Sequence, residues 1–131
     1  MALKKDVLTK AQKAELEQLR PLIVRMGLLP LMTGAAWRSA LDAVMAIAGY
    51  SGLYRLRAVR DAVDPPENRW QGPLPHGLPL YNFIEWLELN PKPQGNRNYS
   101  AAIKQALAEA KISYSETASG IRIHGYRRSK I

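Results

Sequence analysis

The chain contains no cysteine, and this absence excludes several classes of protein. Without cysteine there is no disulfide, no thiolate nucleophile and no cysteine-ligated zinc or iron–sulfur centre. Histidine is also scarce, because His76 and His124 are the only two imidazoles in 131 residues. Neither stands in a metal-ligand spacing, so we expect no metal and no cofactor.

Long apolar runs are absent as well. The longest apolar stretch, residues 40–49, is interrupted by Asp42 and is far shorter than the roughly 20 residues that cross a bilayer. Lys4 and Lys5 near the start are not followed by the apolar segment of a signal peptide. We therefore expect no membrane association and a cytoplasmic location.

Acidic residues are few in relation to basic ones. Eleven Asp and Glu stand against nineteen Lys and Arg, for a formal charge of +8. An excess of this size favours an acidic protein or a nucleic acid as partner. Part of it lies at the ends, which we expect to be flexible over about 1–8 and 127–131, because residues 7–126 carry fourteen basic and ten acidic side chains.

The composition is that of a folded chain. Hydrophobic residues make up 47% of the sequence and charged residues 23%. A chain of 131 residues is within the usual size range of one domain with one core. There is no internal repeat and no linker, so we expect residues 1–131 to form a single domain.

Three segments have apolar residues at helical spacing. The first begins after Thr9, a good N-cap, and Pro21 predicts a kink or restart in it before it ends at Gly27. The second lies between Thr33 and Gly49. The third is predicted over residues 98–110.

Four further segments alternate with period two, which is typical of half-buried strands. They are residues 53–59, 83–89, 112–116 and 121–126, the last two forming a terminal hairpin. The order of elements predicts an α+β fold with a four-stranded, mostly antiparallel sheet and about three helices covering one face.

Alternation along these strands predicts a basic outward face on the sheet. Cations interleaved with an aromatic ring are typical of surfaces that bind phosphates and bases. The interpretation we favour is a solvated face on which arginines pair with Glu85 or Glu88. Alternation also places Glu85 and Trp86 on opposite faces, with Trp86 in the core. The side chains expected on the outward face are Arg55, Arg57, Arg122, His124 and Tyr126.

Residues 64–81 form a long loop with five prolines, and loops of this length are often functional. Trp70 and His76 lie within it. The loop either closes over the core as a lid, which we favour, or forms a binding surface.

Several of these residues resemble a family of small bacterial proteins known only as a domain of unknown function. The resemblance spans about residues 35–126, implies a single domain, and brings no activity, cofactor or site residue with it. It rests on Trp37-Arg38, Tyr54-Arg55-Leu56, Pro65-Pro66, Trp70, Ile84-Glu85-Trp86-Leu87 and Ile121-Arg122-Ile123-His124-Gly125-Tyr126.

These observations lead to three hypotheses of function. The first is a non-enzymatic binding protein for an acidic macromolecular partner, above all a protein. The second is a nucleic-acid-binding domain that uses the same basic face. The third is a small enzyme centred on His76 or His124, although the sequence has neither a Gly-x-Ser-x-Gly elbow nor a phosphate-binding loop. The candidate binding residues are Arg55, Arg57, Arg122, His124, Tyr126, Trp70 and His76.

Overall fold

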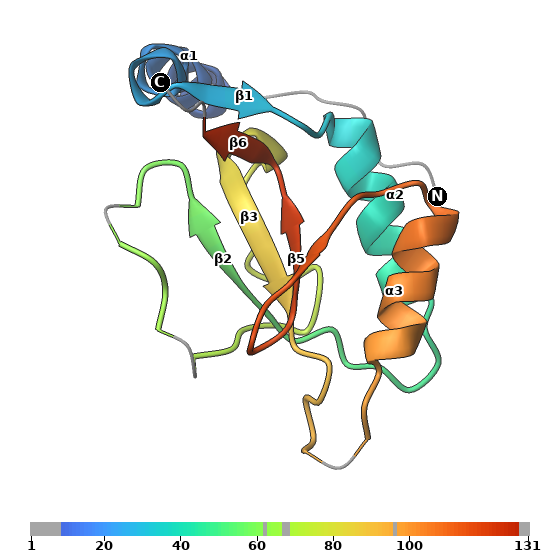
Figure 1. The fold of residues 1–131 in the computed structure, drawn as a ribbon. Helices are drawn as coiled ribbons and strands as arrows, with labels where there is room; N and C mark the ends of the chain where they lie inside the picture. The colour runs from blue at the N-terminus through green and yellow to red at the C-terminus, as the bar shows by residue number, and fades with distance from the viewer. Residues whose placement is uncertain (1–8, 62, 67–68, 96, 129–131) are drawn as a thin grey trace.

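A computed structural model describes residues 9–61, 63–66, 69–95 and 97–128 of the chain. It confirms the α+β fold, with three helices, a four-stranded antiparallel sheet and a separate two-stranded sheet (Figure 1). The larger sheet has the strand order β2-β3-β5-β4. Its strands are β2 (Tyr54–Ala58), β3 (Ile84–Leu89), β4 (Ser115–Glu116) and β5 (Ile121–His124).

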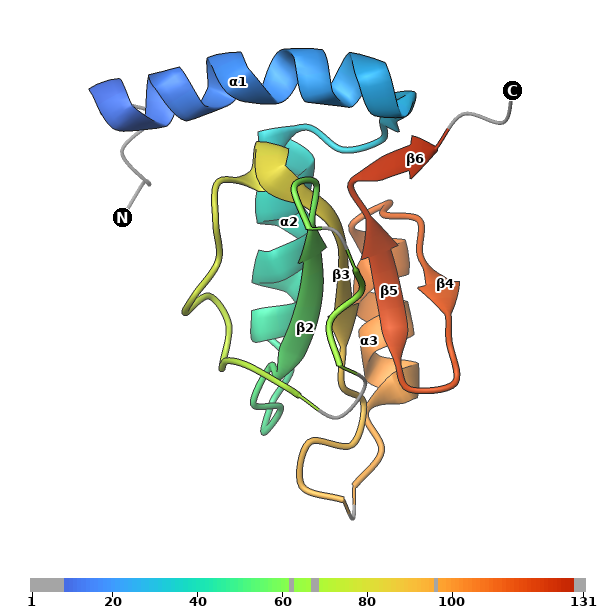
Figure 2. The same ribbon diagram turned by 90° about the vertical axis from the view of Figure 1, so that its left-hand side faces the viewer.

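Two helices, α2 (Gly34–Met45) and α3 (Ser100–Glu109), cover one face of this sheet (Figure 2). Both lie within the ranges predicted for them. The apolar side chains of each helix lie on one side of it, and those of the central strands lie on one face of the sheet. These two apolar surfaces pack against each other. The largest fully buried side chains of this main core include Trp37, Leu41, Ile84, Leu87, Ile103, Leu107, Ile121 and Ile123.

Helix α1 (Lys10–Met26) lies beyond one end of the sheet rather than on its face (Figure 2). Thr9 and Gln12 form a reciprocal capping box at its start, and Gly27 closes it with φ 65°. Helix α1 continues through Pro21, which is exposed, so the restart considered at this residue does not occur. No helix in the described part of the chain has the length and apolar character needed to cross a membrane.

The two-stranded sheet was not predicted from the sequence. Its strands, β1 (Leu28–Pro30) and β6 (Tyr126–Arg128), pair antiparallel. Residues 127 and 128, which we expected to belong to a flexible end, therefore lie in a strand. Residues 1–8 and 129–131 are outside the described ranges.

Gly125 separates β5 from β6 and redirects the chain. Tyr126 consequently leaves the face expected for it, and it packs with Leu19 and Phe83 in a second, smaller core beneath α1. The Tyr126 hydroxyl donates a hydrogen bond to the Asn82 carbonyl at 2.7 Å. This second core attaches α1 to the end of the sheet.

A β-bulge at Glu85 changes which way the polar residues of β3 face. Arg57 pairs with Trp86 while Ala58 pairs with Ile84, so Glu85 is an extra residue in its strand. A bulge of this kind interrupts the alternation of side chains. The expectation that Glu85 and Trp86 face opposite sides is wrong, because both line the same cavity on the face away from α2 and α3. Trp86 is not part of the main core.

The long loop divides into two halves that cover opposite sides of the sheet. In the second half, Leu74 is buried in the main core, and its N–H donates to the Gly52 carbonyl at 3.0 Å. The first half crosses the outward face beside β2 and in front of β3 (Figure 2), where the Pro65 carbonyl accepts a hydrogen bond from Arg55. This half of the loop therefore covers Arg55 and part of the outward face.

Gly125 gives a direct test of the close approach between β5 and the bulge. Its N–H donates to the Glu85 carbonyl at 2.8 Å, and a Cβ there would overlap the carbonyl oxygen of Ile84. We expect Gly125→Ala to destabilise the fold by about 1–3 kcal/mol or more, because the atom it meets is backbone. Gly34→Ala is the matched control, since its nearest neighbour would be Tyr81 at 3.8 Å. Urea unfolding of both variants measures the difference, and equal stabilities would contradict the close packing.

Candidate functional site

Glu88 is a fully buried carboxylate at the centre of the outward face. It accepts five hydrogen bonds, from Arg55, Arg122, Thr117 and Ser119, and the last two belong to the turn between β4 and β5. Burial alone would raise its pKa, but the hydrogen bonds from Ser119, Arg55 and Thr117 outweigh burial and hold the pKa of Glu88 below the usual glutamate value. The side chain is therefore a buried anion at neutral pH.

Arg55 and Arg122 approach this carboxylate from the two neighbouring strands. Arg55 is 5% exposed, and its Nε donates to Glu88 Oε2 at 3.0 Å. Arg122 donates from Nε and Nη2 to the other carboxylate oxygen. The Arg122 guanidinium also lies over the Trp86 ring, 3.7 Å from its centroid, in a close cation–π contact. The predicted pairing of the arginines with glutamates is thus present, but as a buried network.

Glu85 is a second buried carboxylate, and the bulge turns it toward the cavity on the same side of the sheet as Trp86. Arg128 forms a bidentate pair with it, with both N–O distances at 2.9 Å. Arg57 Nε lies 3.2 Å from Glu85 Oε1, and Arg57 Nη1 donates to Asp64 at 2.7 Å. Glu85 therefore joins β2, β3 and β6 on the polar side of the molecule.

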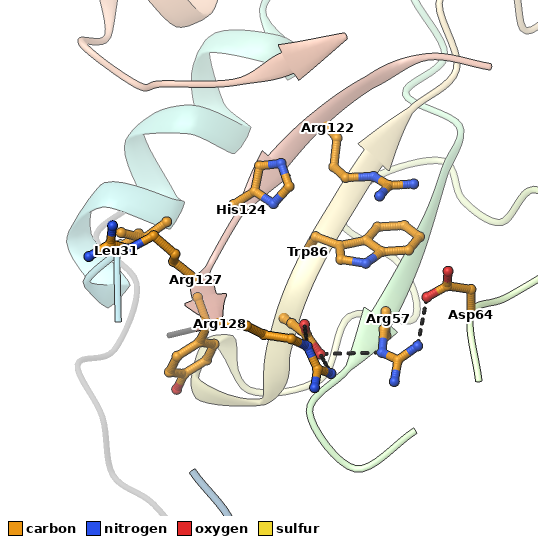
Figure 3. Close-up of a pocket in the computed structure, with 10 residues that line it drawn as sticks. Leu31, Arg57, Asp64, Trp86, Arg122, His124, Arg127 and Arg128 are labelled. Carbon is orange, nitrogen blue, oxygen red and sulfur yellow. Dashed lines mark hydrogen bonds and ion pairs between the residues drawn. The ribbon is translucent and has the colours of Figure 1, made fainter. Parts of the chain in front are cut away.

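A cavity of about 680 Å³ opens on this face, and we call it the basic hollow. Figure 3 shows Trp86 in its wall between Arg122 and Arg57, with Arg128 paired at its floor and Arg127 beside Leu31 at the opposite side. Four arginines line it against two carboxylates. The lining residues are Leu31, Arg57, Asp64, Glu85, Trp86, Arg122, His124, Tyr126, Arg127 and Arg128.

His124 lines the hollow and forms a hydrogen bond with Ser115, whose hydroxyl oxygen lies 2.8 Å from Nε2. Burial and the nearby charge of Arg122 lower the pKa of His124, and Glu85 opposes them only in part. A neutral imidazole bonded to a serine hydroxyl is the pair that activates nucleophiles in enzymes. Among the described residues, however, no carboxylate accepts a hydrogen bond from this ring to orient it.

The structure brings together some of the residues singled out from the sequence and separates others. Arg57, Arg122, His124 and part of Tyr126 line the basic hollow. Arg55 lies beneath the first half of the loop, with its guanidinium 5.7 Å from the ring of the partly buried Trp70. His76 is exposed in the second half of the loop, and its carbonyl accepts a hydrogen bond from the Tyr54 hydroxyl.

Sequence reasoning missed several residues of the hollow, among them Trp86, Arg127 and Arg128, which supply its aromatic wall and half of its arginines. Trp86 was assigned to the core by alternation, which the bulge breaks. Arg127 and Arg128 were assigned to a flexible end, because the alternation of residues 121–124 gives no sign of a second strand after Gly125. Within the described ranges, no group of histidine and acidic side chains could hold a metal ion.

Removing the charge of Glu88 tests the buried network. Glu88→Gln leaves Arg55 buried without its anion, and we expect a loss of about 3–5 kcal/mol in the free energy of unfolding, as is typical when one partner of a buried pair is removed. Glu116→Gln is the matched control, because Glu116 pairs with Lys104 on the surface and should cost less than about 1 kcal/mol. Urea unfolding measures both variants. A similarly small loss of unfolding free energy in Glu88→Gln and Glu116→Gln would contradict the claim that the buried network stabilises the fold.

The lowered pKa of His124 predicts a dependence of stability on pH. The unfolded chain takes up this proton near pH 6.5 and the folded chain only at lower pH, so stability should fall as the pH drops below about 6.5. His124→Gln removes this titration and keeps a partner for Ser115, so the loss of stability between about pH 7 and 5.5 should become smaller. His76→Gln, which leaves His124 and Ser115 in place, is the control variant. An unaltered pH profile in His124→Gln would refute the assignment.

Comparison with known proteins identifies the family of the chain but no activity. No curated protein and no solved structure matches the chain. The model of a family of unknown function, DUF6678, matches residues 19–130, which include both strands of the small sheet, the long loop and the basic hollow. The chain therefore belongs to this family of unknown function, as the resemblance of its motifs indicated.

Proposed function

We propose that the chain is a binding protein that takes an acidic segment of a partner protein into the basic hollow. The observation that carries the proposal is the arrangement of arginines there. Two buried carboxylates fix Arg57, Arg122 and Arg128 in place, and Arg127 at the rim forms no ion pair with any described residue. Arg122 and Arg128 use Nε and Nη2 in these pairs, so the Nη1 side of each guanidinium is left to meet a further carboxylate.

The rim of the hollow also supports a protein partner. Leu31 is 52% exposed and lines the hollow, and Leu29 beside it is 41% exposed and pairs with Arg127 in the small sheet. Apolar and basic side chains adjacent to one another suit a segment in which acidic and apolar residues are mixed. A cytoplasmic location for the chain is part of the same proposal.

The covering of Trp86 argues against recognition of single-stranded nucleic acid. Binding of unpaired bases depends on open aromatic faces on which the bases stack. Trp86 is only 5% exposed, because the Arg122 guanidinium lies over its ring. A base could stack there only after displacing Arg122 from Glu88.

Arg127→Ser tests the proposal without disturbing the buried network. The probe is a labelled peptide of glutamates with two leucines, compared by fluorescence anisotropy with a single-stranded DNA of equal charge. We expect the peptide to bind, and Arg127→Ser to weaken it about three- to tenfold, the effect of one charged contact. Arg97→Ser is the control, since it removes the same charge from the loop between β3 and α3, at the opposite end of the sheet (Figure 2).

Two results would overturn this function. If Arg127→Ser and Arg97→Ser lose the same affinity for the peptide, the binding depends only on the net charge of the protein. Tighter binding of the DNA than of the peptide, with a steep dependence on salt, would replace the proposal by nucleic-acid binding.

A further inference from the structure

A second cavity, which shares no lining residue with the basic hollow, lies between α1, the start of α2 and the end of the long loop. Its volume is about 550 Å³, which is within the range of pockets for small organic ligands. Leu16 lines it from α1, Ala35 and Arg38 from α2, and Leu78 and Leu80 from the loop. We call this cavity the apolar cleft.

One wall of the apolar cleft is fixed by aromatic packing. Tyr81 lines the cleft, and its ring stacks on Trp37 with the two centroids 6.3 Å apart and the planes at 19°. Trp37 is itself fully buried in the main core. Pro75 and Pro79 also line the cleft, and their rings restrict the backbone of the loop. The cleft is therefore bounded by elements that the main core and the prolines hold in place.

Arg38 is the only charged side chain that lines this cleft in the described structure. It forms no ion pair with any described residue, and its Nε is buried without a hydrogen-bond partner. Buried donors normally have acceptors, because leaving one unmet costs free energy. The remaining lining is mostly apolar, so a charge at this position is unusual unless something pairs with it.

We propose that the apolar cleft binds a small apolar molecule that carries a single carboxylate. The apolar part would lie against Leu16, Leu78 and Tyr81, and the carboxylate would pair with the Arg38 guanidinium. A carboxylate matches the paired N–H groups of a guanidinium, and the surrounding apolar residues strengthen the pairing by excluding water. The site uses none of the residues of the basic hollow, so it is independent of the function proposed above.

Calorimetry with octanoate and 1-octanol, which differ in the charged group, tests the site. We expect the wild-type chain to bind octanoate about tenfold or more tightly than 1-octanol, the effect of one charge-assisted pair. Arg38→Met keeps an apolar stem of similar bulk but removes the guanidinium, so it should bring the two affinities close together. Arg97→Met, remote from the cleft, should leave the preference unchanged.

A second variant tests whether the ligands bind in the apolar cleft or at another site. Ala35→Leu fills part of the cleft with a good helix former, so it should weaken both ligands while the melting temperature is retained. Arg127→Ser should leave octanoate binding as it is, since that residue lies in the basic hollow. The proposal is overturned if octanoate does not bind below its micelle-forming concentration, if 1-octanol binds as tightly, or if Arg38→Met or Ala35→Leu leaves octanoate affinity unchanged.

Discussion

The hydrogen-bonded carboxylate of Glu88 holds the polar half of the molecule together. A buried anion is costly unless its oxygens are fully paired, and here donors from β2, from β5 and from the turn before β5 all converge on one side chain. Arg55, held by this carboxylate, in turn donates to the Pro65 carbonyl and so fixes the first half of the long loop. Arg122, held on the other side, lies over Trp86 and shapes the wall of the basic hollow.

The bulge at Glu85 extends this arrangement to the small sheet. By adding one residue to β3, it turns a second carboxylate toward the polar face, where Arg57 and Arg128 meet it. Gly125 makes room for the bulge, because only a residue without a Cβ can lie so close to Ile84. The basic hollow thus depends on a backbone irregularity, a glycine and two buried carboxylates of the same strand.

Much of the fold could be predicted from the sequence, and the exceptions have physical reasons. Alternation in residues 53–59 and helical spacing around Trp37 reflect burial of one face, which the sequence pattern reports directly. Pairing of arginines with Glu85 or Glu88 was expected from the strand positions, but Glu85 meets Arg57 and Arg128 only through the bulge. The bulge could not be predicted, because it depends on the approach of Gly125 from a distant part of the chain. Strand β1 has three residues, too few for a period to be visible.

The central claim is that Glu88 is ionised in the folded protein and anchors the arginines around it. It is tested most directly by following the side-chain carboxyl carbon of Glu88 by NMR as the pH is lowered. The account predicts that this carbon titrates below the range of ordinary glutamates, since hydrogen bonds from Ser119, Arg55 and Thr117 favour the anion. Titration of Glu88 above that range would contradict the account, because burial would then outweigh the network.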